Sequence, residues 1–132
     1  MLFEEALTER LEGDSGVHEL VAQRIHWGIR PADGELPCIV VTILADMRDQ
    51  HLDGFNSLWE TRVQTDCYAA SRLQAAQLRE AVIGAVVPAV EMSGHRFDRA
   101  HINLIADRGD DGTGKYTHRQ LIDLNFWHGT TE

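Results

Sequence analysis

The sequence has few cysteines to cross-link a small protein and no long apolar run to place it in a membrane. It contains two cysteines, Cys38 and Cys67, which lie in apolar stretches without C-x-x-C spacing and are too few for a disulfide framework. We expect both to be buried free thiols. No apolar run reaches the length of a membrane span, and the first residues do not resemble a secretory signal. These absences predict a protein made in a reducing compartment, without a membrane partner.

Positive charge is also scarce, because 12 Lys and Arg residues stand against 21 Asp and Glu residues. The resulting net charge of -9 argues against a protein that grips nucleic acid, since such proteins neutralise phosphates with Lys and Arg. With 132 residues, 43% of them hydrophobic, the chain is long enough to bury a core of its own. We therefore treat residues 1–132 as a single domain.

Helical periodicity is present in three stretches, 2–12, 17–21 and 71–87. The second stretch follows Asp14 and Ser15, either of which is able to cap it. The third begins at a capping box formed by Ser71 and Gln74, and Pro88 ends it.

The pattern of alternating or continuous apolar residues predicts strands at 25–29, 38–45, 59–69, 101–107 and 116–128. The run CIVVTILA at 38–45 predicts a central strand covered on both faces, and the polar stretch 46–57 predicts a flap or turn. The expected fold is α+β, with an antiparallel or mixed sheet of four to five strands and helices packed on one face.

No motif assigns catalysis, a cofactor or a metal. Gly109 to Lys115 matches G-x-x-x-x-G-K by letter, but Tyr116 stands where a phosphate loop needs Ser or Thr, and a strand rather than a helix follows. The same loop lacks the ligands of a calcium-binding EF-hand, and the seven histidines form no H-x-x-x-H pair. We expect no enzyme and no cofactor. The open alternative is a small metal-dependent hydrolase or ligand-binding protein that uses the Asp107–Asp111 loop with nearby histidines.

The sequence does predict an interaction surface. One face of the 59–69 strand is polar and of mixed charge, and the 46–57 flap carries apolar residues among charges. The candidate interface residues, chosen by polarity and expected exposure, are Arg48, Asp53, Phe55, Glu60, Arg62, Gln64, Asp66, Arg119 and Asp123.

The order of these features resembles a known family. A short helical hairpin precedes Arg24-Ile25, Leu36-Pro37 opens a buried strand, and Leu52-Asp53-Gly54 lies in the polar flap. The segment TRVQTDCYA (61–69) then runs into an Ala-rich helix, and the chain closes with DLNFWH (123–128). Over nearly its whole length the sequence resembles the tail completion, or tail terminator, proteins of long-tailed bacteriophages, prophages and gene transfer agents.

This resemblance implies a structural role in the virion rather than catalysis. Family members are α+β proteins that form a ring, commonly a hexamer, on the end of the finished tail tube. The implied partners are further copies of the chain, the tail-tube protein, the head-side connector or stopper protein, and DNA that passes through the lumen without specific binding. The implied location is the cytoplasm of the bacterial host during assembly, then the neck of the virion. The net charge adds the hypothesis of an acidic lumen.

Overall fold

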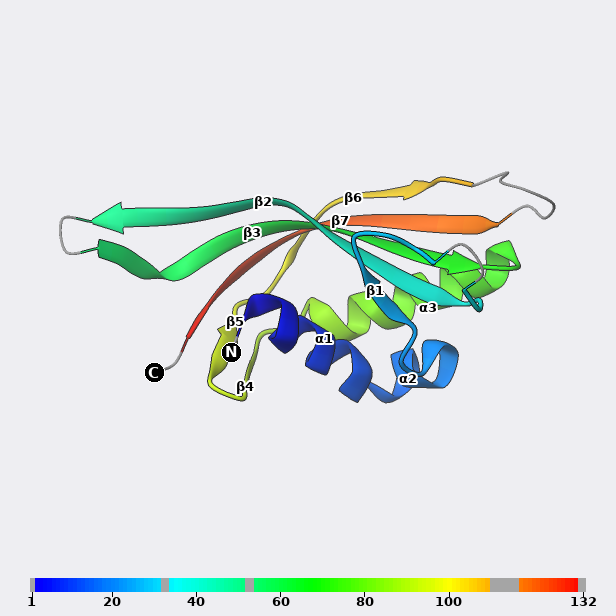
Figure 1. The fold of residues 1–132 in the computed structure, drawn as a ribbon, viewed down its shortest axis with the longest axis horizontal. Coiled ribbons are helices and arrows are strands. Elements are labelled where there is room, and N and C mark those ends of the chain that lie inside the picture. The colour runs from blue at the N-terminus through cyan, green and yellow to red at the C-terminus, as the bar shows by residue number, and fades with distance from the viewer. Residues whose placement is uncertain (1, 32–33, 52–53, 110–116, 131–132) are drawn as a thin grey trace.

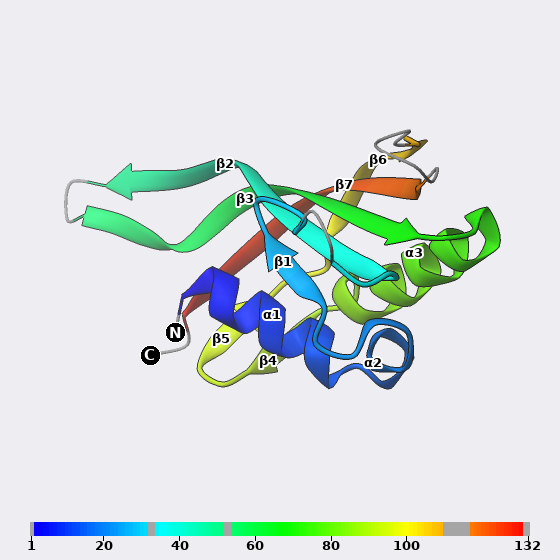
Figure 2. The same ribbon diagram turned by 45° about the vertical axis from the view of Figure 1, so that its right-hand side comes forward.

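The computed structural model describes residues 2–31, 34–51, 54–109 and 117–130. The elements in chain order are α1 (Phe3–Gly13), α2 (Ser15–Val21), β1 (Ile25–Trp27), β2 (Cys38–His51), β3 (Gly54–Ala69), α3 (Arg72–Val86), β4 (Val90–Met92), β5 (His95–Phe97), β6 (His101–Asp107) and β7 (His118–Thr130). Figure 1 shows a long curved sheet with the helices gathered under one face, and the turned view in Figure 2 shows the same arrangement. The expected α+β fold with helices on one face is confirmed.

The sheet is larger than expected and of mixed direction. Its strands run in the order β1-β2-β3-β7-β5-β4, and β6 also pairs with β7, which makes seven strands among the described residues. The β1–β2 pair is parallel and the other pairs are antiparallel. The expected four to five strands were too few because β4 and β5 have three residues each, which is too short for an alternating pattern.

The helices begin where their capping residues predicted. The Ser71 hydroxyl accepts a hydrogen bond of 3.1 Å from the backbone N–H of Gln74 at the start of α3, and Asp14 accepts one of 3.0 Å from Val17 at the start of α2. The apolar stripe of α3 packs into the core with its Ala75, Leu78, Val82 and Val86 side chains buried. Among the described residues, no helix is long and apolar enough to cross a membrane.

The core lies between the helices and the inward faces of β2, β3 and β7. The predicted inward residues of β3, Thr61 to Ala69 by twos, are buried, as are Ile122, Leu124 and Phe126 of β7. Cys38 and Cys67 are buried and free as expected, and burial raises the pKa of both thiols.

The prediction for 38–45 holds only in part. Residues 38–41 of β2 are buried, and β1 pairs along this stretch, so it is internal to the sheet. Farther along, Leu44 is 45% exposed and the strand forms an edge of the sheet. The continuous apolar run therefore overstated how much of the strand is central.

The hairpin turn or flap predicted at 46–57 is a hairpin, but most of that stretch is strand. β2 and β3 continue as a pair as far as His51 and Gly54, and Figure 1 shows the hairpin projecting beyond the helices. Its polar sequence resembles a loop because, away from the core, a strand pair needs no apolar face. Asp53 lies outside the described residues.

Candidate functional site

The face of the sheet opposite the helices, here called the helix-free face, carries the polar residues that the alternation of β3 and β7 predicted. The strand register sets Arg62 opposite Asn125, Gln64 opposite Asp123 and Tyr68 opposite Arg119. Side chains on directly opposite and diagonal positions of one sheet face are close enough to interact. The ladder therefore places the predicted interface residues of β3 and β7 in two adjacent rows.

Arg62 and Asp123 form a two-pronged ion pair across these rows. The Arg62 Nε donates to Asp123 Oδ1 at 3.0 Å and its Nη2 donates to Oδ2 at 2.6 Å. Asn103 of β6 also donates to Asp123, at 3.2 Å. The hydrogen bond from Arg62 holds the pKa of the Asp123 carboxyl below its usual range. The carboxylate is buried while the guanidinium stays half exposed, so the pair presents Arg62 to whatever lies above the sheet.

Asp66 and Arg119 repeat this arrangement with the charges exchanged between strands. The Arg119 Nε donates to Asp66 Oδ1 at 2.9 Å, and Gln64 donates to Asp66 Oδ2 at 3.0 Å. Both ion pairs join diagonal positions of the same hand, because each β7 partner lies two residues before the residue opposite its β3 partner. The Tyr68 ring, with the guanidinium of Arg119 at 5.6 Å and that of Arg30 at 4.8 Å, closes this end of the row.

Glu60 lies at the end of these two rows that is farther from Tyr68. It accepts a hydrogen bond of 2.9 Å from Asn125, which in turn accepts one of 2.8 Å from Asn103. The helix-free face is thus a connected polar surface over β3, β7 and β6, and not a set of independent solvated side chains. Its five charged residues on β3 and β7 carry a net charge of -1, from Glu60, Asp66 and Asp123 against Arg62 and Arg119.

Three of the predicted interface residues do not join this surface. Arg48 lies on the opposite face of the sheet, where its guanidinium is 4.3 Å from the centre of the Trp59 ring and forms an ion pair of 2.8 Å with Asp46. Phe55 pairs with Gln50 near the end of the hairpin, and Asp53 falls outside the described residues. Polarity alone could not assign Arg48 to a face of the sheet. The register shift between Ile43 and Ala45 changes which face the later residues of β2 occupy.

A buried histidine pair lies where β5 meets the end of β7, and the sequence patterns did not reveal it. His95 Nε2 and His128 Nδ1 are 3.0 Å apart, and His128 Nε2 is 2.6 Å from the Thr61 hydroxyl. Both rings are buried, and the Phe3 ring lies tilted against His128 with the ring centres 4.3 Å apart. Burial lowers the pKa of His95 and lowers that of His128 to about 4, so both rings are neutral at pH 7.

The hydrogen-bond pattern selects one tautomer of the pair. The remaining nitrogen, His95 Nδ1, is buried without a partner among the described residues. Leaving a lone pair unpaired costs less than leaving an N–H unpaired, since carbonyl-type acceptors are more often found unsatisfied than donors. We therefore assign the proton of His95 to Nε2, which donates to His128 Nδ1, while His128 Nε2 donates to Thr61. Above Thr61 and His128 lies a cavity of 190 Å³, also lined by Arg48, Trp59 and Leu2.

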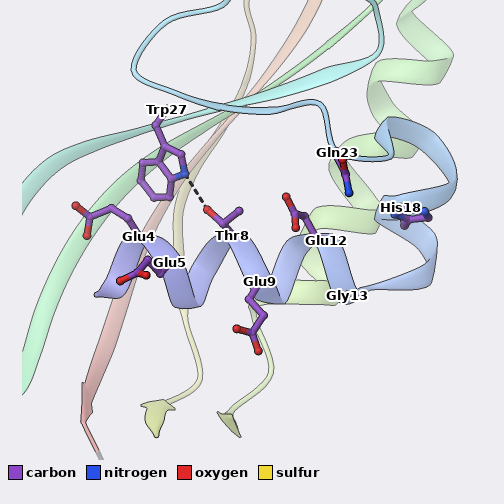
Figure 3. A pocket seen from close by; sticks show the side chains of 9 residues that line it. All are labelled: Glu4, Glu5, Thr8, Glu9, Glu12, Gly13, His18, Gln23 and Trp27. Carbon is purple, nitrogen blue, oxygen red and sulfur yellow. Dashed lines mark hydrogen bonds between the residues drawn. The ribbon is translucent and has the colours of Figure 1, made fainter. Parts of the chain in front are cut away.

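The acidity of the chain is concentrated on the helical side. A groove of 740 Å³ runs along α1 and is lined by Glu4, Glu5, Glu9 and Glu12, with Trp27 of β1 in its wall (Figure 3). The Trp27 indole N–H donates to the Thr8 hydroxyl at 2.9 Å, which ties β1 to the helix. Residues 3–21 hold six carboxylates against one guanidinium, so the negative charge faces away from the helix-free face.

The alternative site at Asp107 to Asp111 gains no support from the described residues. Asp107 accepts hydrogen bonds from Arg72, at 2.8 Å, and from Gln120, and the bond from Arg72 lowers the pKa of the Asp107 carboxyl. Within the described ranges, no group of three or more His, Cys, Asp or Glu side chains is arranged to hold a metal ion. Asp110 and Asp111 lie outside those ranges.

The comparisons with known proteins decide the family. The family model described as "Tail completion protein gp17" matches residues 5–129, nearly the whole chain. The chain belongs to this family. The resemblance predicted from the sequence is confirmed, and the protein is a structural protein of phage-type tails.

Among solved structures, the fold of this tail completion protein is similar to a chain in the "Virion of native gene transfer agent (GTA) particle". The TM-score is 0.61, with 17% sequence identity over 96% of this chain and 95% of that one. At this identity the likeness concerns the fold. The comparison with curated proteins found no match.

Proposed function

We propose that this chain caps the finished tail tube as a ring, commonly a hexamer in the family, and joins the tube to the head-side connector or stopper protein. The observation that carries the proposal is the match to the tail completion family over residues 5–129. The similarity in fold to a chain of a gene transfer agent virion supports it. On this proposal the protein assembles in the cytoplasm of the bacterial host and remains in the neck of the particle.

A ring of identical subunits joins two different surfaces of each subunit, because its interfaces are heterologous. The elongated molecule in Figure 1 offers such surfaces at its opposite ends, the β2–β3 hairpin at one and the β6–β7 strands at the other. The predicted interface residues Glu60, Arg62, Gln64, Asp66, Arg119 and Asp123 form the polar surface between these ends. We propose that this surface is presented to another component of the particle.

DNA passes the ring during ejection without being gripped. The ion-paired helix-free face suits such a wall, because each exposed guanidinium is already paired with a buried carboxylate and offers little unpaired charge to phosphates. This modifies the expectation of an acidic lumen, since the excess of carboxylates lies along α1 and α2. The lumen wall is then close to neutral when the helix-free face lines it.

Deletion of the coding sequence from a particle-producing strain tests the role. The expected result is full heads together with separate tails of irregular, often excessive, length, and complementation with the intact chain restores joined particles. Normal joined particles in the deletion strain would overturn the proposal.

A further inference from the structure

The two longest open edges of the described sheet are β6 and the part of β2 beyond β1, and both carry exposed apolar residues. On β6, Leu104 is 50% exposed on the helix-free face and Ile105 is 41% exposed on the other, whereas Ile102 packs partly buried against the core. On the opposite edge, β2 beyond the part paired with β1 exposes Leu44 and Met47. Open apolar edges are templates for pairing with another chain, and natural proteins usually blunt or cover them. We propose that the β6 edge of one subunit pairs with the β2 edge of the next, so that a continuous sheet runs around the ring.

The β6 edge fits within the open part of β2. β6 has seven residues, and β2 continues for ten residues, Thr42 to His51, after those paired with β1. At strand rise the seven residues of β6 span about 24 Å. The β2 edge can therefore cover β6 along its whole length, which suits a second copy of this chain as the occupant.

Strand direction permits the joint without turning either subunit over. β2 is antiparallel to β3, β3 to β7 and β7 to β6, so β6 runs opposite to β2 within one subunit. Neighbours in a cyclic ring have the same orientation relative to the axis. The β6 strand of one copy therefore meets β2 of the next antiparallel, the better-paired arrangement for a ladder.

The open edges also limit the stagger between neighbours. Through β7 and β3, β6 lies level with Ile39 to Ala45 of β2, whereas the open part of β2 is Thr42 to His51. Each joint therefore displaces the next copy by roughly three to six residues along the strands, about 10–20 Å. Such a displacement tilts the strands against the ring axis, as closure of a sheet requires.

The position of the helices indicates which face of the sheet lines the lumen of the ring. A bulky layer fits more easily on the larger, outer circumference, and α1, α2 and α3 all lie on one face of the sheet. The helix-free face, with its Arg62–Asp123 and Asp66–Arg119 pairs, then lines the lumen. The inference rests on the proposed function and assigns the surfaces that form its ring.

Two variants test the joint, each with one blocked edge. Leu44→Glu with Met47→Glu places charge on the β2 edge. Leu104→Glu with Ile105→Pro blocks the β6 edge. The Pro substitution leaves the internal ladder intact, because the Arg108 N–H donates to Arg119 in β7, and alternation then turns the Ile105 N–H to the open edge. Leu73→Glu, on an exposed position of α3, is the matched control.

The first readout is capping of tail tubes assembled from the tail-tube protein of the same particle, counted by electron microscopy. We expect the intact chain and the Leu73→Glu control to cap tubes, and both edge variants to lose capping while keeping the circular dichroism spectrum of the intact chain. Capping by either edge variant as frequent as by the intact chain overturns the edge pairing and leaves the proposed function standing. Absence of capping by the intact chain itself overturns both.

Mixing the two edge variants gives a second readout that misfolding cannot imitate. Each variant keeps the edge that the other has lost, so a mixture is able to form a single joint. Native mass spectrometry is expected to find monomers of each variant alone and one-to-one heterodimers in the mixture. A mixture that stays monomeric at concentrations where the intact chain assembles would overturn the proposed joint.

Discussion

At the scale of single residues, the buried His95–His128 pair ties the stability of the fold to pH. The folded chain holds the pKa of His128 near 4, whereas an unfolded histidine titrates near 6.5. Between these values the unfolded chain binds the proton more tightly. The free energy of unfolding contributed by this group is therefore complete above about pH 6.5 and is lost as the pH falls toward 4.

We expect the free energy of unfolding to fall by up to about 1.4 kcal/mol per pH unit through this window for His128 alone. Urea unfolding at pH 7, 6 and 5 measures it. His128→Gln should flatten the dependence, and His18→Gln, at an exposed position of α2, should leave it as steep as in the intact chain. An equally steep profile for His128→Gln would contradict the assignment.

We expect the ion pairs with a buried carboxylate on the helix-free face to contribute more to stability than the exposed pair of Arg72 and Asp107. Arg119→Ala leaves the buried carboxylate of Asp66 with Gln64 as its remaining side-chain donor among the hydrogen bonds described above, and we expect a loss of about 1–3 kcal/mol in the free energy of unfolding. Arg72→Ala removes a pair in which both side chains are more than half exposed, and should change stability little. Equal effects in denaturant titrations would contradict the distinction.

These residue-scale features differ in how far the sequence predicts them. Alternation alone puts Arg62, Asp66, Arg119 and Asp123 on the outward faces of two strands, which the register confirms. The choice of diagonal partners, and the burial of both carboxylates beneath the guanidinium groups, depend on how β3 and β7 align, which no local pattern encodes. The histidine pair is invisible for the same reason, since its members lie 33 positions apart on different strands.

At the scale of helices and strands, the sequence predicts an element well where a capping residue is followed by a long apolar stripe. The cap at Ser71 and the apolar stripe behind it define α3 almost to the residue. Replacing this cap with Ser71→Ala should cost about 1 kcal/mol of stability by thermal or denaturant unfolding, because the Gln74 N–H then loses its acceptor. Ser93→Ala, which removes an exposed hydroxyl hydrogen bond to Glu9 but no helix cap, is the control, and an equal loss for it would argue against the cap.

The β2–β3 hairpin shows where local signals fail. Its polar sequence indicates a loop, yet the backbone continues as a paired ribbon, because cross-strand hydrogen bonds form without a buried face. Replacing residues 49–58 by an Asn-Gly turn joins Arg48 to Trp59, which already face each other in the ladder. We expect the thermal midpoint to change little, since the hairpin projects beyond the helices that cover the core, and tube capping to be lost. Retained capping by the shortened chain would show that the hairpin is dispensable.

At the scale of the whole molecule, the helical layer and the sheet differ in charge, and this difference bears on the proposed role. The helical layer carries the acidity, whereas the sheet presents paired charges over its helix-free face and apolar residues at its open edges. The run of six carboxylates at 3–21 is visible in the sequence, but the face of the sheet on which it lies is set only when α1 and α2 pack. The family resemblance over nearly the full length is what links these surfaces to a tail.

The most direct test of the central claim is electron microscopy of tail tubes assembled from the tail-tube protein of the same particle, with and without this chain. We expect the chain to form a ring at one end of each tube and to stop its growth, which narrows the distribution of tube lengths. Tubes of the same length distribution, with no additional density at either end, would contradict it.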